Sequence, residues 1–169
     1  MKISFEEKQE LEAIYQSFFT NEKIQRMRDI EMHRGSDTFT HSFKVAKTAI
    51  KRALRHKKVD LKAVLVGSIL HDYYLYDWRK NRSLLKKHGK NHPKIAATNA
   101  KKDFDIDEFV QSIIKAHMWP INFKDFPNSK EARIVNLADD HIALKESLTS
   151  RRFKAKRKEK YENYIKSLF

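Results

Sequence analysis

The chain has 169 residues, of which 40% are apolar, and its 36 basic and 22 acidic residues give a net charge of +14 at pH 7. This composition supports one folded domain rather than a disordered chain, and the positive charge favours anionic partners. The absence of cysteine excludes a disulfide framework, a thiolate metal site and a cysteine nucleophile, and the lack of a long apolar run favours a soluble cytoplasmic protein with no membrane partner.

Helical signals begin at the N-terminus. Ser4 opens a capping box and predicts the start of a helix whose apolar residues recur at helical spacing. Asn21 predicts the cap of a second, shorter helix. Glycine and short polar residues predict a loop at residues 33–37. A third helix is expected over residues 40–56, because alanine and valine form an apolar stripe along it.

The middle of the chain contains its most apolar segment. Asp60 predicts the cap of a helix over residues 61–70, which is apolar nearly all round and is therefore expected to be central and buried. An aromatic run follows at residues 73–78, and core packing is a better interpretation of it than a surface on which a base or sugar stacks. Residues 79–91 are polar and are predicted to form a loop, with room for one helical turn around Leu84 and Leu85.

The remaining segments also indicate helices. Pro93 predicts the first turn of a helix that ends near residue 102. Apolar periodicity predicts two more helices over residues 107–117 and 130–148. Since the chain has only three Gly and three Pro, few turns are available, and no strand is predicted. The expected fold class is all-α.

The expected domain organisation is one helical domain over residues 1–150. Residues 151–169 begin with seven basic residues in the ten positions 151–160. This segment is expected to form a basic helix or tail that packs on the same domain through its last apolar side chains. The oligomeric state is left open by the sequence.

Polar side chains stand where core residues are expected on several of the predicted helices. These residues are His41, His71, Asp72, His117 and Asp139. A single one would most simply be a satisfied core group, but several from separate helices require another explanation. Burial of two carboxylates near several imidazoles is favourable if a divalent cation replaces their solvation. The pattern therefore indicates a metal site inside a helix bundle.

His92 is a weaker candidate ligand, because it stands just before Pro93 without an apolar stripe beside it. His88 would be an alternative if the preceding stretch were helical, which Gly89 and Pro93 disfavour. His33 and His56 have the sequence context of loop or surface residues, and His141 is expected to turn away from the helix face that bears Asp139.

The order of the candidate ligands resembles that of the HD-domain metal-dependent phosphohydrolases. The local sequences that carry the resemblance are HSFKVA around His41, VGSILHD at His71 and Asp72, HPKIAATNA at His92, IIKAHMWP at His117 and NLAD at Asp139. The resemblance covers about residues 33–148. It implies an all-α helical bundle around a buried His/Asp metal site.

The resemblance also implies a role for each ligand. A first metal ion would be held by His41, His71, Asp72 and Asp139. Asp72 would act as the catalytic bridge to a second ion, which His92 and His117 would complete. Nitrogen and oxygen ligands suit divalent Fe, Mn, Co, Ni or Zn, and the family favours Fe or Mn. Two cations would lower the pKa of a bound water and neutralise phosphoryl oxygens during its attack.

The implied reaction is hydrolysis of a phosphate ester or anhydride in a small phosphorylated molecule, with a nucleotide as the preferred substrate class. Arg34, Lys44 and Lys94 are candidate phosphate contacts, because they lie near ligands in the sequence. Many relatives follow the His-Asp pair with a short Gly-Lys turn. The aromatic run at residues 73–78 replaces that turn and removes one candidate phosphate contact.

Two other functions are compatible with the sequence. A di-iron oxygenase uses the same ligand set within this superfamily, and it would require oxygen and a redox-active metal. A nucleic-acid-binding module with a structural metal is the second alternative, because basic residues gather at 44–62 and 151–160. Steep salt dependence of nucleic-acid binding would distinguish the module from the enzymes.

Overall fold

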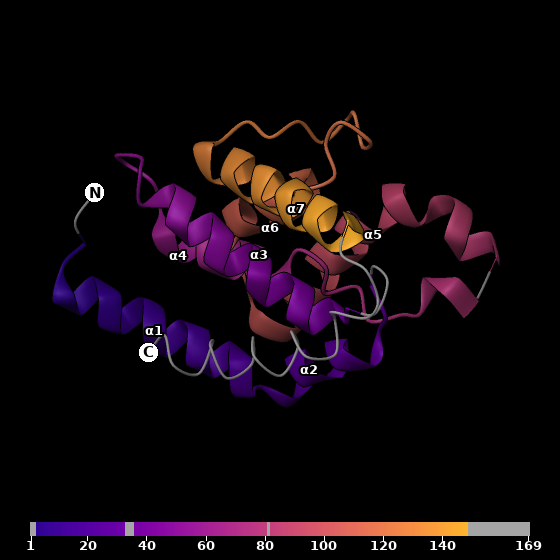
Figure 1. The fold of residues 1–169 in the computed structure, drawn as a ribbon, viewed down its shortest axis with the longest axis horizontal. Coiled ribbons are helices and arrows are strands. Elements are labelled where there is room, and N and C mark those ends of the chain that lie inside the picture. The colour runs from indigo at the N-terminus through magenta and orange to yellow at the C-terminus, as the bar shows by residue number, and fades with distance from the viewer. Residues whose placement is uncertain (1–2, 33–35, 81, 149–169) are drawn as a thin grey trace.

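The computed structural model describes residues 3–32, 36–80 and 82–148 (Figure 1). Its elements in chain order are α1 Phe5–Thr20, α2 Glu22–Gln25, the 3-10 helix η1 Arg26–Asp29, α3 Thr38–Ala53, α4 Leu61–Leu70, the 3-10 helix η2 Trp78–Lys80, α5 Arg82–Phe104, α6 Glu108–Ala116 and α7 Lys130–Leu148. The described residues contain one isolated bridge, between Glu31 and Asp37, and no strand. The predicted all-α class is therefore confirmed.

Short polar residues begin most of these helices, as the sequence predicts. Ser4 accepts a hydrogen bond from the backbone N–H of Glu7 and completes the capping box of α1. The side chains of Asn21, Asp60 and Asp107 accept backbone hydrogen bonds in the same way. Asp37 caps α3, so this helix begins two residues earlier than predicted and ends at Ala53. The bounds of α7 agree with the prediction.

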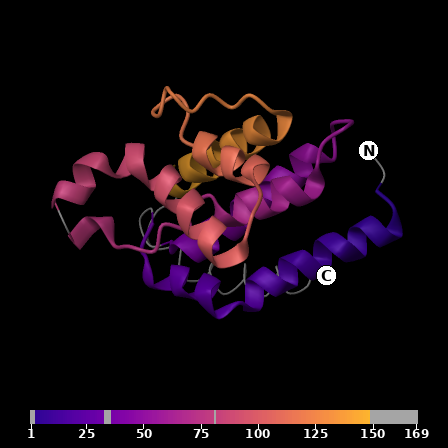
Figure 2. The ribbon, with the colours of Figure 1, turned by 180° about the vertical axis from the view of Figure 1, so that it is seen from behind.

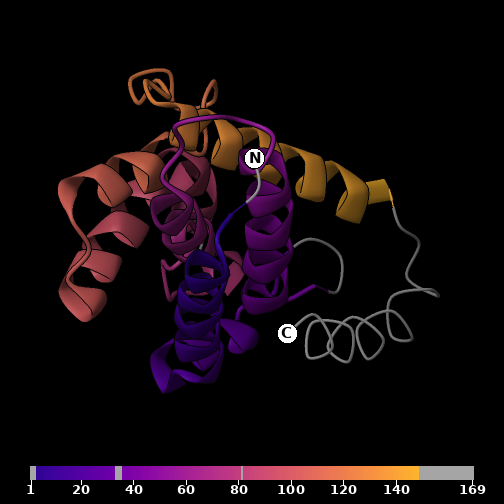
Figure 3. The same cartoon turned by 90° about the vertical axis from the view of Figure 1, so that its left-hand side faces the viewer.

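The helix α4 lies at the centre of the bundle. It packs against α3, α6, α7 and α1, and eight of its ten residues are buried. Figures 1 and 3 show α7 lying across α3 on the side opposite α1. Figure 2 shows α5 and α6 together on the back of the bundle. The expected central position of this apolar helix is confirmed, and its C-terminal end therefore lies deep inside the protein.

The predicted loop at residues 79–91 is wrong for most of its length. The helix α5 begins at Arg82 and continues through Pro93 to Phe104. Residues 82–91 lack an apolar stripe, but Leu, Lys and Arg have high helix propensity, so local preference suffices to form the first turns. Pro93 removes one backbone donor from the helix interior, and the neighbouring His88 carbonyl accepts an additional bond from the His92 side chain.

Gly67 allows α4 and α6 to approach closely. A Cβ atom at this position would lie 2.8 Å from the Cγ2 atom of Ile113. We expect Gly67→Ala to lower the free energy of unfolding by about 1–3 kcal/mol, because a fully buried neighbour must shift. Urea denaturation of the purified variant measures this change.

Gly89 supplies the matched control for that substitution. It also lies inside a helix, but the atoms nearest a Cβ there, in Ile121 and Met118, are 3.8 and 3.9 Å away. Gly89→Ala should leave stability unchanged or raise it by up to about 1 kcal/mol through helix propensity. Equal stability of the Gly67→Ala and Gly89→Ala proteins would contradict the close packing of α4 on α6.

None of the helices in the described ranges is both long and apolar enough to cross a membrane. The basic residues 151–169, predicted to form a helix or tail, lie outside the described residues.

Candidate metal centre

Five helical segments contribute polar side chains to one buried cluster. His41 lies on α3, His71 and Asp72 follow the end of α4, His92 lies on α5, His117 follows α6 and Asp139 lies on α7. The structure brings all six predicted ligands together, and their candidate ligand atoms form overlapping groups in which the atoms lie within 4.8 Å of one another. Each of the six is at most 7% exposed. Bulk water therefore solvates none of them well.

The two carboxylate oxygens of Asp72 face different pairs of histidines. Oδ2 lies 3.2 Å from His71 Nε2 and 3.9 Å from His41 Nε2. Oδ1 lies 3.2 Å from His92 Nε2 and 3.7 Å from His117 Nε2. One carboxylate thus stands between two imidazole pairs, which is the position of a bridging ligand.

Asp139 lies beside the first of these pairs. Its Oδ1 is 2.9 Å from His41 Nε2 and 3.6 Å from His71 Nε2. Two imidazoles and two carboxylates therefore lie around His41 and His71, while His92 and His117 share Asp72. A further group, His71, His117 and Asp139, joins the two sides. The division of these ligands between two ions stays a prediction.

Backbone carbonyls fix the protonation pattern of three histidines. The Nδ1 atoms of His71, His92 and His117 lie 2.7, 2.8 and 2.7 Å from the carbonyl oxygens of Ser68, His88 and Ile114, respectively. A carbonyl oxygen can only accept a hydrogen bond, so each Nδ1 carries the proton. Each Nε2 is then the ring nitrogen that faces the ligand cluster, and it is the atom that would bind a metal ion after losing any proton.

Glu146 plays for His41 the part that the backbone carbonyls play for the other three histidines. The sequence analysis did not predict this residue. The Nδ1 of His41 donates to Oε2 of this buried glutamate over 2.9 Å. Glu146 follows Asp139 by seven residues, or two helical turns, so both lie on one face of α7. The seven-residue spacing from Asp139 is visible in the sequence. A single Glu near the end of a polar helix is usually exposed, however, so the spacing alone does not predict its burial.

The buried polar atoms of this centre are suited to holding a cation. The Nε2 atoms of His92 and His117 lie 2.8 Å apart, within hydrogen-bond distance. His71 Nε2 and Asp72 Oδ1 are buried and make no hydrogen bond. Buried polar atoms without a partner are unfavourable alone, whereas a divalent ion among them would satisfy each one. The residues present therefore fit the metal site that the sequence predicts.

Both aspartates remain ionised in this environment. Burial opposes the charge on Asp72, but the neighbouring charges of His71 and His92 hold the pKa of Asp72 well below its usual value. Burial likewise opposes the charge on Asp139, and His71 and His41 lower its pKa. Burial, with nearby histidine charges, lowers the pKa of His117 to about 3, so this imidazole stays neutral and able to bind metal.

The three residues predicted to contact phosphate lie in different parts of the chain and differ in their surroundings. The Lys44 ammonium group lies 2.6 Å from Oε1 of Glu146. Lys94 is exposed on α5, two residues after His92 and thus on another side of the helix. Arg34 lies outside the described residues. The role of each in substrate binding stays a prediction.

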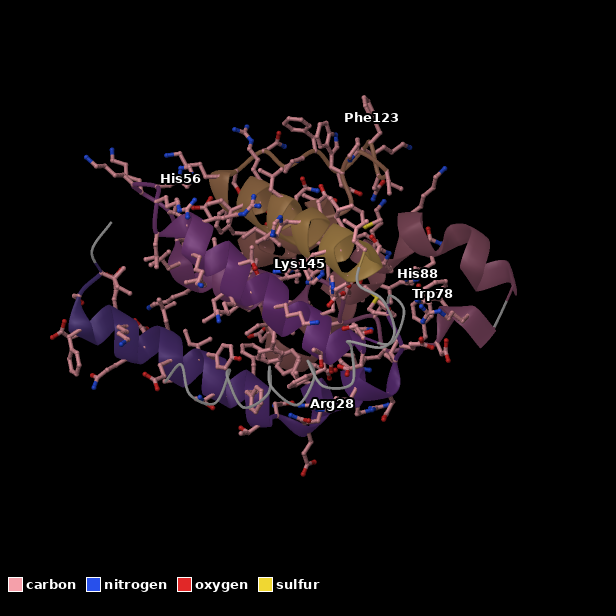
Figure 4. The ribbon with its side chains drawn as sticks, in the orientation of Figure 1. Arg28, His56, Trp78, His88, Phe123 and Lys145 are labelled. Carbon is pink, nitrogen blue, oxygen red and sulfur yellow. The ribbon has the colours of Figure 1, made fainter. Side chains whose placement is uncertain are left out.

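The aromatic run is built into the protein rather than offered to a ligand. Tyr73 and Tyr74 are at most 2% exposed, as core packing requires. Trp78 stacks on His88 at 4.7 Å between ring centroids, and the Arg79 guanidinium lies over the same indole at 4.5 Å (Figure 4). These contacts and the burial of Tyr73 and Tyr74 agree with core packing for the start of the run, while Tyr76 and Trp78 are half-buried.

Two of the histidines that are not candidate ligands are described by the structure, and both lie outside the buried cluster. His56 and His141 are exposed. Figure 4 shows His56 at the other end of α3 from Trp78 and His88. His33 lies outside the described residues.

The fold and the centre together define an all-α bundle with a His/Asp site for divalent metal. The HD domain model matches residues 38–144, which is well over half of the chain. The chain therefore belongs to the HD-domain family, whose members form a metal-dependent hydrolase superfamily. Comparisons with curated proteins and with solved structures gave no match.

Proposed function

We propose that this protein is a metal-dependent phosphohydrolase that cleaves a phosphate ester or anhydride of a small phosphorylated molecule, with a nucleotide as the favoured substrate class. The observation that carries the proposal is the position of Asp72, whose two oxygens face two separate imidazole pairs. A bridging carboxylate of this kind suits a two-metal site, and such sites are common in enzymes that transfer or hydrolyse phosphoryl groups.

The side chains of this chain would hold, orient and insulate the reacting groups. Bound divalent ions, with Fe or Mn favoured, supply Lewis acidity to the phosphoryl oxygens and lower the pKa of water. The Nδ1 hydrogen bonds fix the ring of each histidine, so little reorganisation is needed during the reaction. Burial of Asp72 and Asp139 excludes competing water from the ligand set. The net charge of +14 attracts anionic substrates from solution.

A hydrolysis screen with defined metals tests this proposal. We expect the chelator-treated protein to release phosphate from nucleotides or sugar phosphates only after Mn²⁺, Fe²⁺, Co²⁺, Ni²⁺ or Zn²⁺ is restored. The Asp72→Asn variant is the matched negative control, because it preserves size and removes the charge. Inactivity of the metal-loaded protein on the whole panel, or turnover that needs oxygen, would contradict phosphate hydrolysis and favour the oxygenase.

The basic C-terminal residues are expected to be dispensable for this chemistry. All six proposed ligands and Glu146 precede residue 148. A chain ending at Ser150 should retain its metal content and hydrolysis, even if it loses affinity for nucleic acid in a salt-dependent manner. Metal analysis of the folded, shortened protein measures this. Loss of metal from that protein would show that residues 151–169 take part in the centre.

A further inference from the structure

We infer that Glu146 is a positioning residue that fixes His41 as an Nε2 ligand and makes the first metal position the tighter of the two. Its carboxylate is 7% exposed and lies between three donors. Oε2 accepts from His41 Nδ1 at 2.9 Å, while Oε1 accepts from Lys44 Nζ at 2.6 Å and from Ser36 Oγ at 3.2 Å. The inference rests on the metal centre of the proposed function and not on its substrate.

The helix α7 holds the His41 ring from both sides. Asp139 faces Nε2 at 2.9 Å, and Glu146, two turns further along, faces Nδ1 at 2.9 Å. A helix is stiff over two turns, so both carboxylates are fixed relative to the imidazole between them. The ring therefore has one orientation in which Nδ1 is protonated and Nε2 points at the ligand cluster.

His41 differs from the other three histidines in the charge of its acceptor. The Nδ1 groups of His71, His92 and His117 donate to neutral backbone carbonyls three or four residues earlier in the chain. Only His41, among these four, donates to a carboxylate. A carboxylate partner withdraws the Nδ1 proton more strongly and raises the electron density at Nε2, which strengthens a metal–imidazole bond.

The charge distribution around the two positions agrees with this difference. The first position has Asp72 and Asp139 as ligands and Glu146 behind His41. The second has Asp72 as its one described carboxylate. Divalent ions should therefore fill the first position at lower concentration.

Metal titration of the full chain tests the role of Glu146. Mn²⁺ is added to chelator-treated protein carrying His92→Ala, so that the first position is titrated alone, and binding is followed by calorimetry. We expect Glu146→Gln in this background to raise the dissociation constant by about 10–100-fold. Glutamine keeps the size of the side chain but removes the charge that polarises His41.

Glu131 provides the matched control. It is a buried glutamate at the other end of α7, 8% exposed, and it accepts a hydrogen bond from the backbone of Asp60. Glu131→Gln should change thermal stability but leave the Mn²⁺ affinity unchanged. An unchanged affinity in the Glu146→Gln protein, or an equal loss in both variants, would overturn the inference.

The protonation state of His41 gives a second readout that needs no substitution. In the Zn²⁺-loaded wild type, ¹⁵N NMR of the histidine rings should show a proton on Nδ1 of His41 and none on Nε2. In Glu146→Gln the His41 signals should shift, while those of His71, His92 and His117 stay in place. A zinc-loaded His41 protonated on Nε2 would refute the role of Glu146, regardless of any measured hydrolysis.

Discussion

Replacing Asp72 with alanine is expected to remove metal from both positions and to lower turnover by about 1000-fold or more. Asp72 is the one described side chain whose oxygens face both imidazole pairs. Its loss therefore weakens both groups of ligands, whereas each other substitution affects one. Several kcal/mol of transition-state stabilisation depend on correctly placed ions, and each 1.4 kcal/mol corresponds to a factor of ten in rate.

The stability of the metal-free Asp72→Ala protein provides a second part of this test. Because a buried carboxylate without its ion is itself unfavourable, removing it should lower the free energy of unfolding less than the loss of a fully satisfied buried group would. Metal analysis after dialysis, hydrolysis assays and chelated urea denaturation are measured on the same preparation. A variant that retains the metal content of the wild type would disprove the bridging position of Asp72.

Replacing His92 or His117 with alanine should remove one ion and leave the other bound. Both Nε2 atoms lie nearest the Oδ1 side of Asp72, and His117 also lies within 4.8 Å of the ligand atoms of His71 and Asp139. Turnover should still fall by about 100-fold or more, because one of the two activating charges is lost.

His41→Ala and Asp139→Ala are the comparison variants for this prediction. They remove ligands of the other position, so they should spare the ion held by His92 and His117 at saturating metal. The measurement is metal content as a function of free metal concentration for all four proteins. Identical loss in the four variants would mean that the ligands form one position rather than two.

The candidate metal ligands could be predicted from the sequence, but the residue that orients one of them, Glu146, could not. His41, His71 and Asp139 could be found because a polar residue on a buried stripe is conspicuous, and the resemblance to HD-domain proteins supplied His92. Glu146 could not be found in this way, because its burial depends on how α7 crosses α3 and on contacts about a hundred residues apart in the chain.

The errors in helix prediction have a similar origin. The polar start of α5 lacks the apolar periodicity on which helix prediction relies, and Pro93 falsely indicated the beginning of the helix. The protonation of the histidines was equally hidden, since the carbonyl of Ser68 or Ile114 becomes an acceptor only at the geometry of a helix end. Patterns of residue type report burial, whereas hydrogen-bond partners depend on the folded backbone.

The number of ions bound by active wild-type protein tests the two-position centre most directly. Protein loaded with excess Mn²⁺ or Fe²⁺ and freed of unbound metal is analysed for metal and for hydrolysis in parallel. The geometry around Asp72 predicts about two ions per chain, with activity lost on chelation and regained as the second ion binds. A single ion at full activity, retained when His92 or His117 is replaced, would contradict this centre and leave His41, His71, Asp72 and Asp139 as a mononuclear site.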